Sequence, residues 1–129
     1  LWMLGDPDRI RPDLAAELRA NRTRLLLSAA SSWEIAIKWA VGRLSLPEPP
    51  ATYVPSRMQR TNVESLAVTH SHTLQVATLP RHHRDPFDRL LIAQAQLEGV
   101  PLVTVDRALD DYDVETIRAD RCAHGDVDV

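Results

Sequence analysis

The sequence has little cysteine and little glycine, and it has no long apolar run. Its single cysteine, Cys122, cannot form an intramolecular disulfide, which favours a reducing compartment. The four glycines form neither a phosphate-binding loop nor a dinucleotide-binding fingerprint. The apolar runs are far shorter than a membrane span, and no signal-peptide pattern is visible. We therefore expect a cytoplasmic protein that does not enter the membrane.

Lysine is almost absent, because Lys38 is the only lysine among the 15 basic residues. Arginine favours bidentate contacts with phosphate, although a genome rich in G and C produces the same bias. The net charge of −3 does not by itself indicate a nucleic-acid-binding protein. The 129 residues, with a hydrophobic fraction of 44%, suit one globular domain. We expect this domain to span residues 1–118 and residues 119–129 to form a flexible tail.

Apolar periodicity predicts strands that alternate with helices along the chain. The strands are expected at residues 24–28, 64–68, 101–105 and 114–117. Residues 1–4 are expected to be the last turn of a helix, and further helices are expected at residues 12–20, 31–41, 51–60, 71–79 and 86–98, with a short helix or turn at 106–111. Ser31 or Ser32 is the expected cap of the 31–41 helix. This alternation predicts an α/β fold with a mainly parallel sheet.

The central stretch of the chain, residues 79–95, reads as a loop that becomes a buried helix. Asp85 is a suitable N-cap, and Pro86 at the first helical position has no N–H to leave unpaired. Asp88 falls in the first turn, where the helix dipole favours a carboxylate. Both aspartates therefore have a purely structural explanation as well as a functional one.

Three acidic residues follow or precede strands at positions where parallel sheets form sites. Glu34 comes soon after the strand that ends near Ser28, Asp106 follows the 101–105 strand, and Asp88 opens the helix that leads into that strand. Carboxylates that converge repel each other unless a cation neutralises them. Oxygen ligands suit Mg²⁺ or Mn²⁺, which support phosphodiester hydrolysis. Helix capping and surface roles are the alternative explanation for these three residues.

Three motifs, at residues 28–38, 79–95 and 102–106, resemble the PIN-domain family and most of all the VapC-type toxin ribonucleases. The resemblance implies a three-layer PIN-like fold and a metal-dependent endoribonuclease toxin of a type II toxin–antitoxin system. RNA is the implied substrate, a cognate antitoxin the implied partner, and a homodimer the implied assembly. By position, Glu34, Asp88 and Asp106 match the family's catalytic and metal-binding acids. Asp85 and Thr104 match positions that support the site.

The sequence departs from the family pattern at its first residue. Family members usually open with a strand that ends in a metal-binding aspartate, and this sequence begins just after that motif, at Leu1 and Trp2. We therefore expect the fold to lack its first, central strand, which would leave an open gap in the sheet and a weak or inactive nuclease. Restoring upstream residues should increase metal-dependent cleavage.

Basic and aromatic residues outside the acidic set have two readings each. Arg81 and Arg84, with His82 and His83 between them, either belong to a surface loop or line the entry to the site and contact RNA phosphates. Arg89 is expected either to pair with an acid or to bind a phosphate of the substrate. The histidines at positions 70 and 72 are expected to be exposed, and the tryptophans at positions 2, 33 and 39 to lie in the core or at an interface.

Two other functions compete with the ribonuclease. A catalytically inactive domain would still bind antitoxin or RNA as an interaction module. A phospho-accepting receiver domain also has an α/β fold with clustered acids, but it needs a lysine near its last strand. The only lysine here is Lys38, on an early helix, which argues against a receiver domain.

Overall fold

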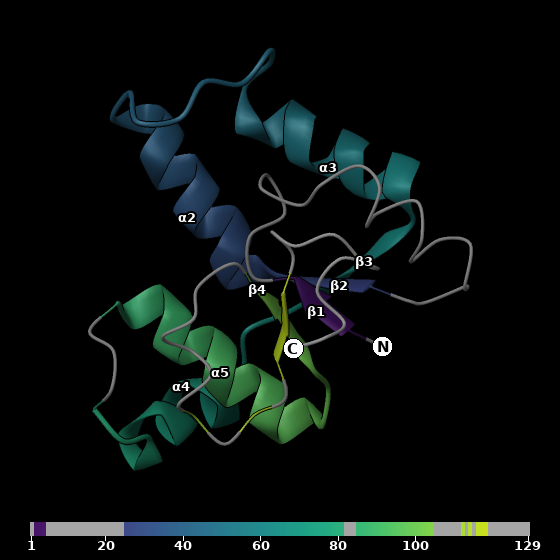
Figure 1. Ribbon diagram of the computed structural model, residues 1–129. Coiled ribbons are helices and arrows are strands. Elements are labelled where there is room, and N and C mark those ends of the chain that lie inside the picture. Colours follow the sequence, from purple (N-terminus) through teal and green to yellow (C-terminus); the bar gives the residue numbers. More distant parts are fainter. Residues whose placement is uncertain are drawn as a thin grey trace.

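The computed structural model describes residues 2–4, 25–81, 85–104, 112, 114 and 116–118 (Figure 1). The elements are β1 (Trp2–Leu4), β2 (Leu25–Ser28), α2 (Ala29–Ala40), α3 (Pro50–Thr61), β3 (Val63–Leu66), α4 (His70–Gln75), the 3-10 helix η2 (Val76–Thr78), α5 (Pro86–Glu98), β4 (Leu102–Thr104) and β5 (Thr116–Arg118). The helix expected at residues 12–20, the turn at 106–111 and the tail at 119–129 lie outside the described residues.

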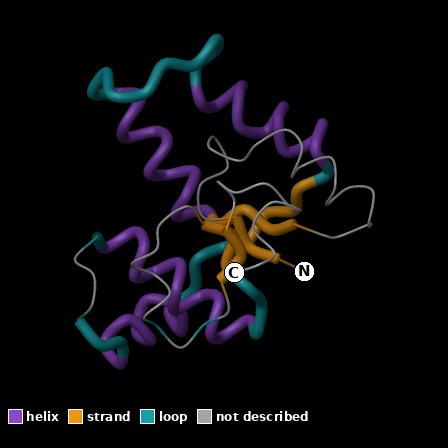
Figure 2. The backbone as a smooth tube through the Cα atoms, in the orientation of Figure 1, coloured by secondary structure: helices purple, strands orange, loops and turns teal. Residues whose placement is uncertain are grey.

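The five strands form one sheet in the order β3-β2-β1-β4-β5, seen in orange in Figure 2. All four pairs of neighbouring strands are parallel. Strand β2 is buried along its whole length, as expected for a central parallel strand that is covered on both faces. The predicted α/β fold with a mainly parallel sheet is therefore confirmed.

The expected helical turn at residues 1–4 is wrong, and so is the expected gap in the sheet. Residues Trp2–Leu4 form strand β1, which occupies the centre of the sheet between β2 and β4. Met3 is in register with Leu26 on one side and with Leu102 on the other. Three apolar residues are too few to show a period of 2 or of 3.6, so pairing with both neighbours decided their conformation.

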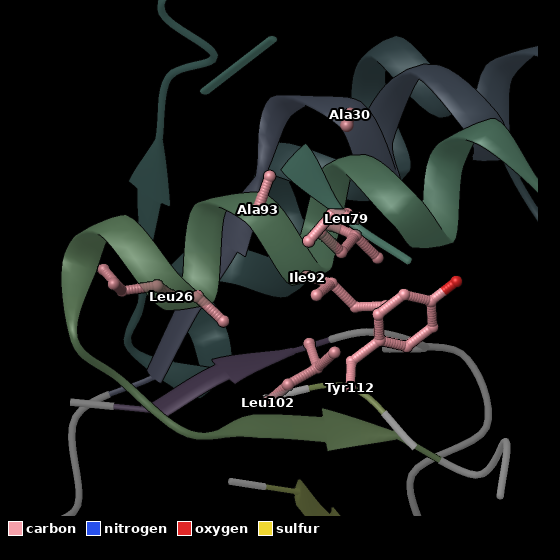
Figure 3. Close-up of a cluster of buried hydrophobic side chains, with 9 residues drawn as sticks. Leu26, Ala30, Leu79, Ile92, Ala93, Leu102 and Tyr112 are labelled. Atoms are coloured by element: carbon pink, nitrogen blue, oxygen red, sulfur yellow. The ribbon is translucent and has the colours of Figure 1, made fainter. Parts of the chain in front are cut away.

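Helix α5 packs against the sheet and supplies more residues to the buried core cluster than any other element. Asp85 caps its N-terminus, Pro86 is its first residue, and Gly99 ends it in the left-handed region at φ 66°, as the sequence predicted. Residues 91–95 are all buried. Figure 3 shows Ile92 together with Leu102 and Tyr112 between the helix and the strands. Burial of this apolar face is the main stabilising contribution to the domain.

Helix α2 follows β2 directly, so its N-terminus lies at the carboxyl edge of the sheet. Its cap is Ser28, whose Oγ accepts a hydrogen bond from the Ala30 N–H at 3.0 Å. The expected caps, Ser31 and Ser32, lie inside the helix instead. Helix α3 packs on α2, and α4 packs on α5 (Figure 1). None of the described helices has the length and apolar content that a membrane span requires.

Candidate functional site

The second turn of α2 and the first turn of α5 meet through an aromatic contact. The rings of Trp33 and Phe87 lie edge to face, with centroids 5.1 Å apart and planes inclined by 69°. A second contact joins the same helices, because the Ser28 hydroxyl donates to the side chain of Gln94. Ser28 is the cap that precedes α2 and contacts Gln94 late in α5, whereas Trp33 comes later and contacts Phe87 early in α5, so the two helices pass each other in opposite directions. Glu34, next to Trp33, is therefore level with the first turn of α5.

Glu34 is mostly covered and is paired within its own helix. Its side chain is 18% exposed, and its Oε2 lies 3.2 Å from the Lys38 Nζ, four residues along the same helix. Lys38 is half exposed, so water screens this pair and its contribution to stability is small. Glu34 therefore holds a carboxylate that is paired with a half-exposed cation of its own helix.

Asp85 and Asp88 are the two acidic residues at the start of α5. Asp85 Oδ1 accepts hydrogen bonds from the backbone N–H of Phe87 at 2.8 Å and of Asp88 at 3.3 Å. This confirms Asp85 as the N-cap, with its carboxylate occupied by the backbone. The half-buried Asp88 lies in the first turn, where the helix dipole stabilises its negative charge.

The ends of β2 and β4 lie level at one edge of the sheet. Leu4 of β1 pairs with Leu27 on one side and with Val103 on the other, so Ser28 and Thr104 each come one residue later at the same edge. Ligand sites of parallel α/β sheets form beyond this edge. The structure describes Thr104 as the last residue of β4, whereas Asp106 lies outside the described residues.

Arg89 holds the protein's own backbone, which argues against the substrate-binding role expected for it. Its Nη1 donates to the Pro80 carbonyl at 2.8 Å and to the Tyr112 hydroxyl at 3.3 Å, and its Nη2 donates to the Val76 carbonyl at 3.2 Å. A guanidinium engaged in this way fastens the segment before α5 to the helix. Arg81 is exposed, whereas Arg84, His82 and His83 lie outside the described residues.

Sequence reasoning missed a buried polar cluster on α4 and α5. His72, expected to be exposed, is only 3% exposed, and Gln94 is completely buried. Both are hydrogen-bonded to each other and to neighbouring elements. The available signal was Gln94 itself, a polar residue inside the apolar run of α5, since buried polar groups need partners.

Of the three acidic residues expected to bind a metal ion, the structure describes Glu34 and Asp88 but not Asp106. No group of three or more His, Cys, Asp or Glu residues that would hold a metal occurs among residues 2–4, 25–81, 85–104, 112, 114 and 116–118. Glu34 and Asp88 are the described acids that the two helices bring to one level. Their carboxylate oxygens suit Mg²⁺ or Mn²⁺ and not a soft metal.

Comparison with known proteins gives a family for nearly the whole chain. The model of the PIN domain family matches residues 1–115. Ribonuclease VapC16 of Mycobacterium tuberculosis is 49% identical over 69 residues, a match that covers 50% of this chain and 49% of that protein. The chain thus matches about half the length of this curated relative.

Solved structures support the fold. A chain of FitAB, in a structure of that complex bound to the IR36 DNA fragment, matches with a TM-score of 0.60 and 16% identity. That match covers 96% of this chain and 99% of the other. A chain of FitAcB from Neisseria gonorrhoeae matches with a TM-score of 0.56 and 15% identity, covering 92% and 98%. At these identities the likeness concerns the fold alone.

Proposed function

Because this chain belongs to the PIN-domain family, we propose that it is a metal-dependent endoribonuclease toxin of a type II toxin–antitoxin system. The observation that carries the proposal is the antiparallel passage of α2 and α5, which brings Glu34 level with the turn that holds Asp88. The match to a ribonuclease supports the same activity. A lone Cys122 and an RNA substrate both fit a cytoplasmic location.

In this proposal Glu34, Asp88 and Asp106 hold Mg²⁺ or Mn²⁺. When bound, such an ion polarises a phosphate oxygen and makes water more acidic. The chain's own contribution is to hold the carboxylates in place. Asp85 secures the first turn of α5 and thereby orients Asp88. Thr104 ends β4 at the same edge and would support the site with its hydroxyl.

The proposed substrate is RNA, and the proposed contacts to its phosphates come from Arg81 and Arg84. Arg81 is exposed just before the start of α5, so it is available to a ligand at that end of the helix. Phosphate contacts of this kind position a nucleic acid without reading its sequence. The predicted product ends are a 5′-phosphate and a 3′-hydroxyl.

A binding role is the second candidate function, and exposed apolar side chains on α2 favour it. Trp33 is 61% exposed and Val41 is 65% exposed, and Ile37 and Trp39 are also exposed on this helix. Apolar groups concentrated in this way mark an interaction surface. We propose that the antitoxin covers it. The homodimer implied by the resemblance stays a prediction, to be tested by light scattering.

Cleavage of RNA by this chain with Mg²⁺ or Mn²⁺ tests the proposal. We expect Asp88→Asn to lower the rate by roughly 100-fold or more, because it removes a metal-binding charge. Glu48→Gln, at an exposed acid outside the site, is the matched control and should leave the rate unchanged. Equal rates for Asp88→Asn and the wild type would refute the assignment. RNA or antitoxin binding without cleavage would favour the inactive binding module.

A further inference from the structure

Gln94 is a fully buried polar residue that the proposed chemistry does not use. It lies between Ala93 and Ala95 in the middle of α5, where every neighbouring position on the chain is apolar and buried. An amide at such a position is costly unless each of its polar atoms has a partner. The structure supplies partners for both ends of the amide.

The oxygen of the Gln94 side chain is directed at the cap of α2. Ser28 Oγ accepts from the Ala30 N–H at 3.0 Å, and it donates its own proton to Gln94 Oε1 at 2.5 Å. The same hydroxyl thus caps α2 and ties it to α5. Since Oε1 accepts this proton, the amide nitrogen must point the other way.

The nitrogen of the Gln94 side chain reaches the loop after β3 and helix α4. Its Nε2 lies 3.4 Å from the Ala67 carbonyl and 3.2 Å from His72 Nδ1. His72 Nδ1 also accepts from the Thr69 N–H at 3.0 Å, so this ring nitrogen carries no proton. The ring proton of His72 is therefore on its Nε2, and His72 Nε2 donates to Glu98 Oε2 at 2.9 Å. The result is a hydrogen-bond chain with one direction throughout.

We propose that Gln94 is a positioning residue that sets the alignment of α2 against α5 and thereby the spacing of the two acids. This inference rests on the proposed function for its catalytic meaning. The Ser28–Gln94 bond lies six residues away from the acid on each side, because Glu34 follows Ser28 by six residues and Asp88 precedes Gln94 by six. The bond therefore fixes the helix pair at a point away from the two acids. The Trp33–Phe87 contact is the other anchor.

The alignment needs both anchors because a packed helix pair can shift along its axis. Without the Ser28–Gln94 bond, the edge-to-face contact with a largely exposed indole and the packing of Ala30 in the shared core still hold α2 against α5, but neither is as directional as a hydrogen bond. A shift of about 1 Å at a reacting centre is enough to cost about 100-fold in rate. Gln94 therefore matters to the site although it lies almost two helical turns from Asp88.

Gln94→Met is the variant that tests this inference, because methionine fills a similar volume and cannot accept the Ser28 proton. We expect a Mn²⁺ dissociation constant raised roughly tenfold and a kcat lowered by about as much, with KM for RNA little changed. Calorimetry of Mn²⁺ binding and steady-state cleavage provide the measurements. Glu98→Leu removes the acceptor at the far end of the hydrogen-bond chain, and Leu79→Ala destabilises the core elsewhere. Both controls should keep the wild-type affinity for Mn²⁺.

A structural readout separates the inference from the proposed function. Gln94→Met should weaken the nuclear Overhauser contacts between the rings of Trp33 and Phe87, whereas Leu79→Ala should keep them. If the wild type neither binds Mn²⁺ nor cleaves RNA, the proposed function fails and these contacts still decide the positioning role. Unchanged ring contacts and unchanged Mn²⁺ affinity in Gln94→Met would overturn it. An equal loss of affinity in Leu79→Ala would also overturn it, since a general loss of stability would then explain the effect.

Discussion

Trp33 and Phe87 meet edge to face at 5.1 Å, and each is the immediate neighbour of an acidic residue of the proposed site. This aromatic pair joins the early turns of α2 and α5. It is also open to solvent, since the indole of Trp33 is mostly exposed. The pair therefore links the stability of the helix interface to the arrangement of Glu34 and Asp88.

The aromatic pair should have a measurable coupling energy. In a double-mutant cycle of Trp33→Leu and Phe87→Leu, we expect about 0.5–1.5 kcal/mol of coupling in urea unfolding. The value should fall near the lower end, because water reaches the indole. A cycle of Trp39→Leu with Phe87→Leu is the control and should give no coupling. Additive effects of Trp33→Leu and Phe87→Leu would contradict the contact.

The cap of α5 should contribute to stability through the Asp85 carboxylate. Asp85→Ala removes the acceptor for two backbone N–H groups and should cost about 1 kcal/mol of unfolding free energy. Asp85→Asn retains an acceptor oxygen and should cost less. Chemical denaturation measures both variants. Equal losses for alanine and asparagine would show that capping is not the role of this side chain.

Substitutions of Arg89 and Arg81 should distinguish a structural arginine from a substrate-binding one by their effect on stability. Arg89→Met removes hydrogen bonds to two backbone carbonyls and a hydroxyl, and it should cost about 1–3 kcal/mol of stability. Arg81→Met, at an exposed position, should change stability by less than about 0.5 kcal/mol.

The same two variants should differ in RNA binding. For an uncleavable RNA, Arg81→Met should lower the affinity and reduce the slope of log affinity against log salt by about 1. Folded Arg89→Met should retain the wild-type slope. A reduced slope in Arg89→Met would restore Arg89 as a phosphate contact.

Substitutions of Glu34 and of Lys38 should have the same small effect on stability but different effects on RNA cleavage. Lys38 is half exposed, so the i,i+4 pair is worth about 0.3–0.5 kcal/mol, and both Glu34→Gln and Lys38→Met should leave the unfolding midpoint nearly unchanged. Only Glu34→Gln should abolish Mg²⁺-dependent cleavage. Cleavage assays at saturating Mg²⁺ compare the two. Equal activity in both variants would remove Glu34 from the proposed site.

Local signals predicted the helix that supplies the core. Asp85, Pro86 and Gly99 mark the ends of α5 through capping, a fixed φ and the left-handed conformation. These effects act over a few residues, so a sequence reveals them directly. The motifs around these residues also indicated the family that the comparison confirms.

Other features depend on partners that are distant in the chain. Residues Trp2–Leu4 became a strand because β2 and β4 pair with them from both sides. His72 became buried because Gln94, 22 residues away, provides it with a hydrogen-bond partner. Arg89 donates to the carbonyls of Val76 and Pro80, which only the tertiary fold places beside it.

The amino-acid sequence alone determined the parallel α/β class, the buried α5 with its caps, and the acidic residues that the family resemblance singled out. Tertiary structure decided the central place of β1, the antiparallel passage of α2 and α5, and the direction of the hydrogen bonds through Gln94. The physical reason is the separation along the chain of the groups that interact. Capping and periodicity are set by neighbours within a turn, whereas strand pairing and buried hydrogen bonds depend on groups that come together only when the chain has folded.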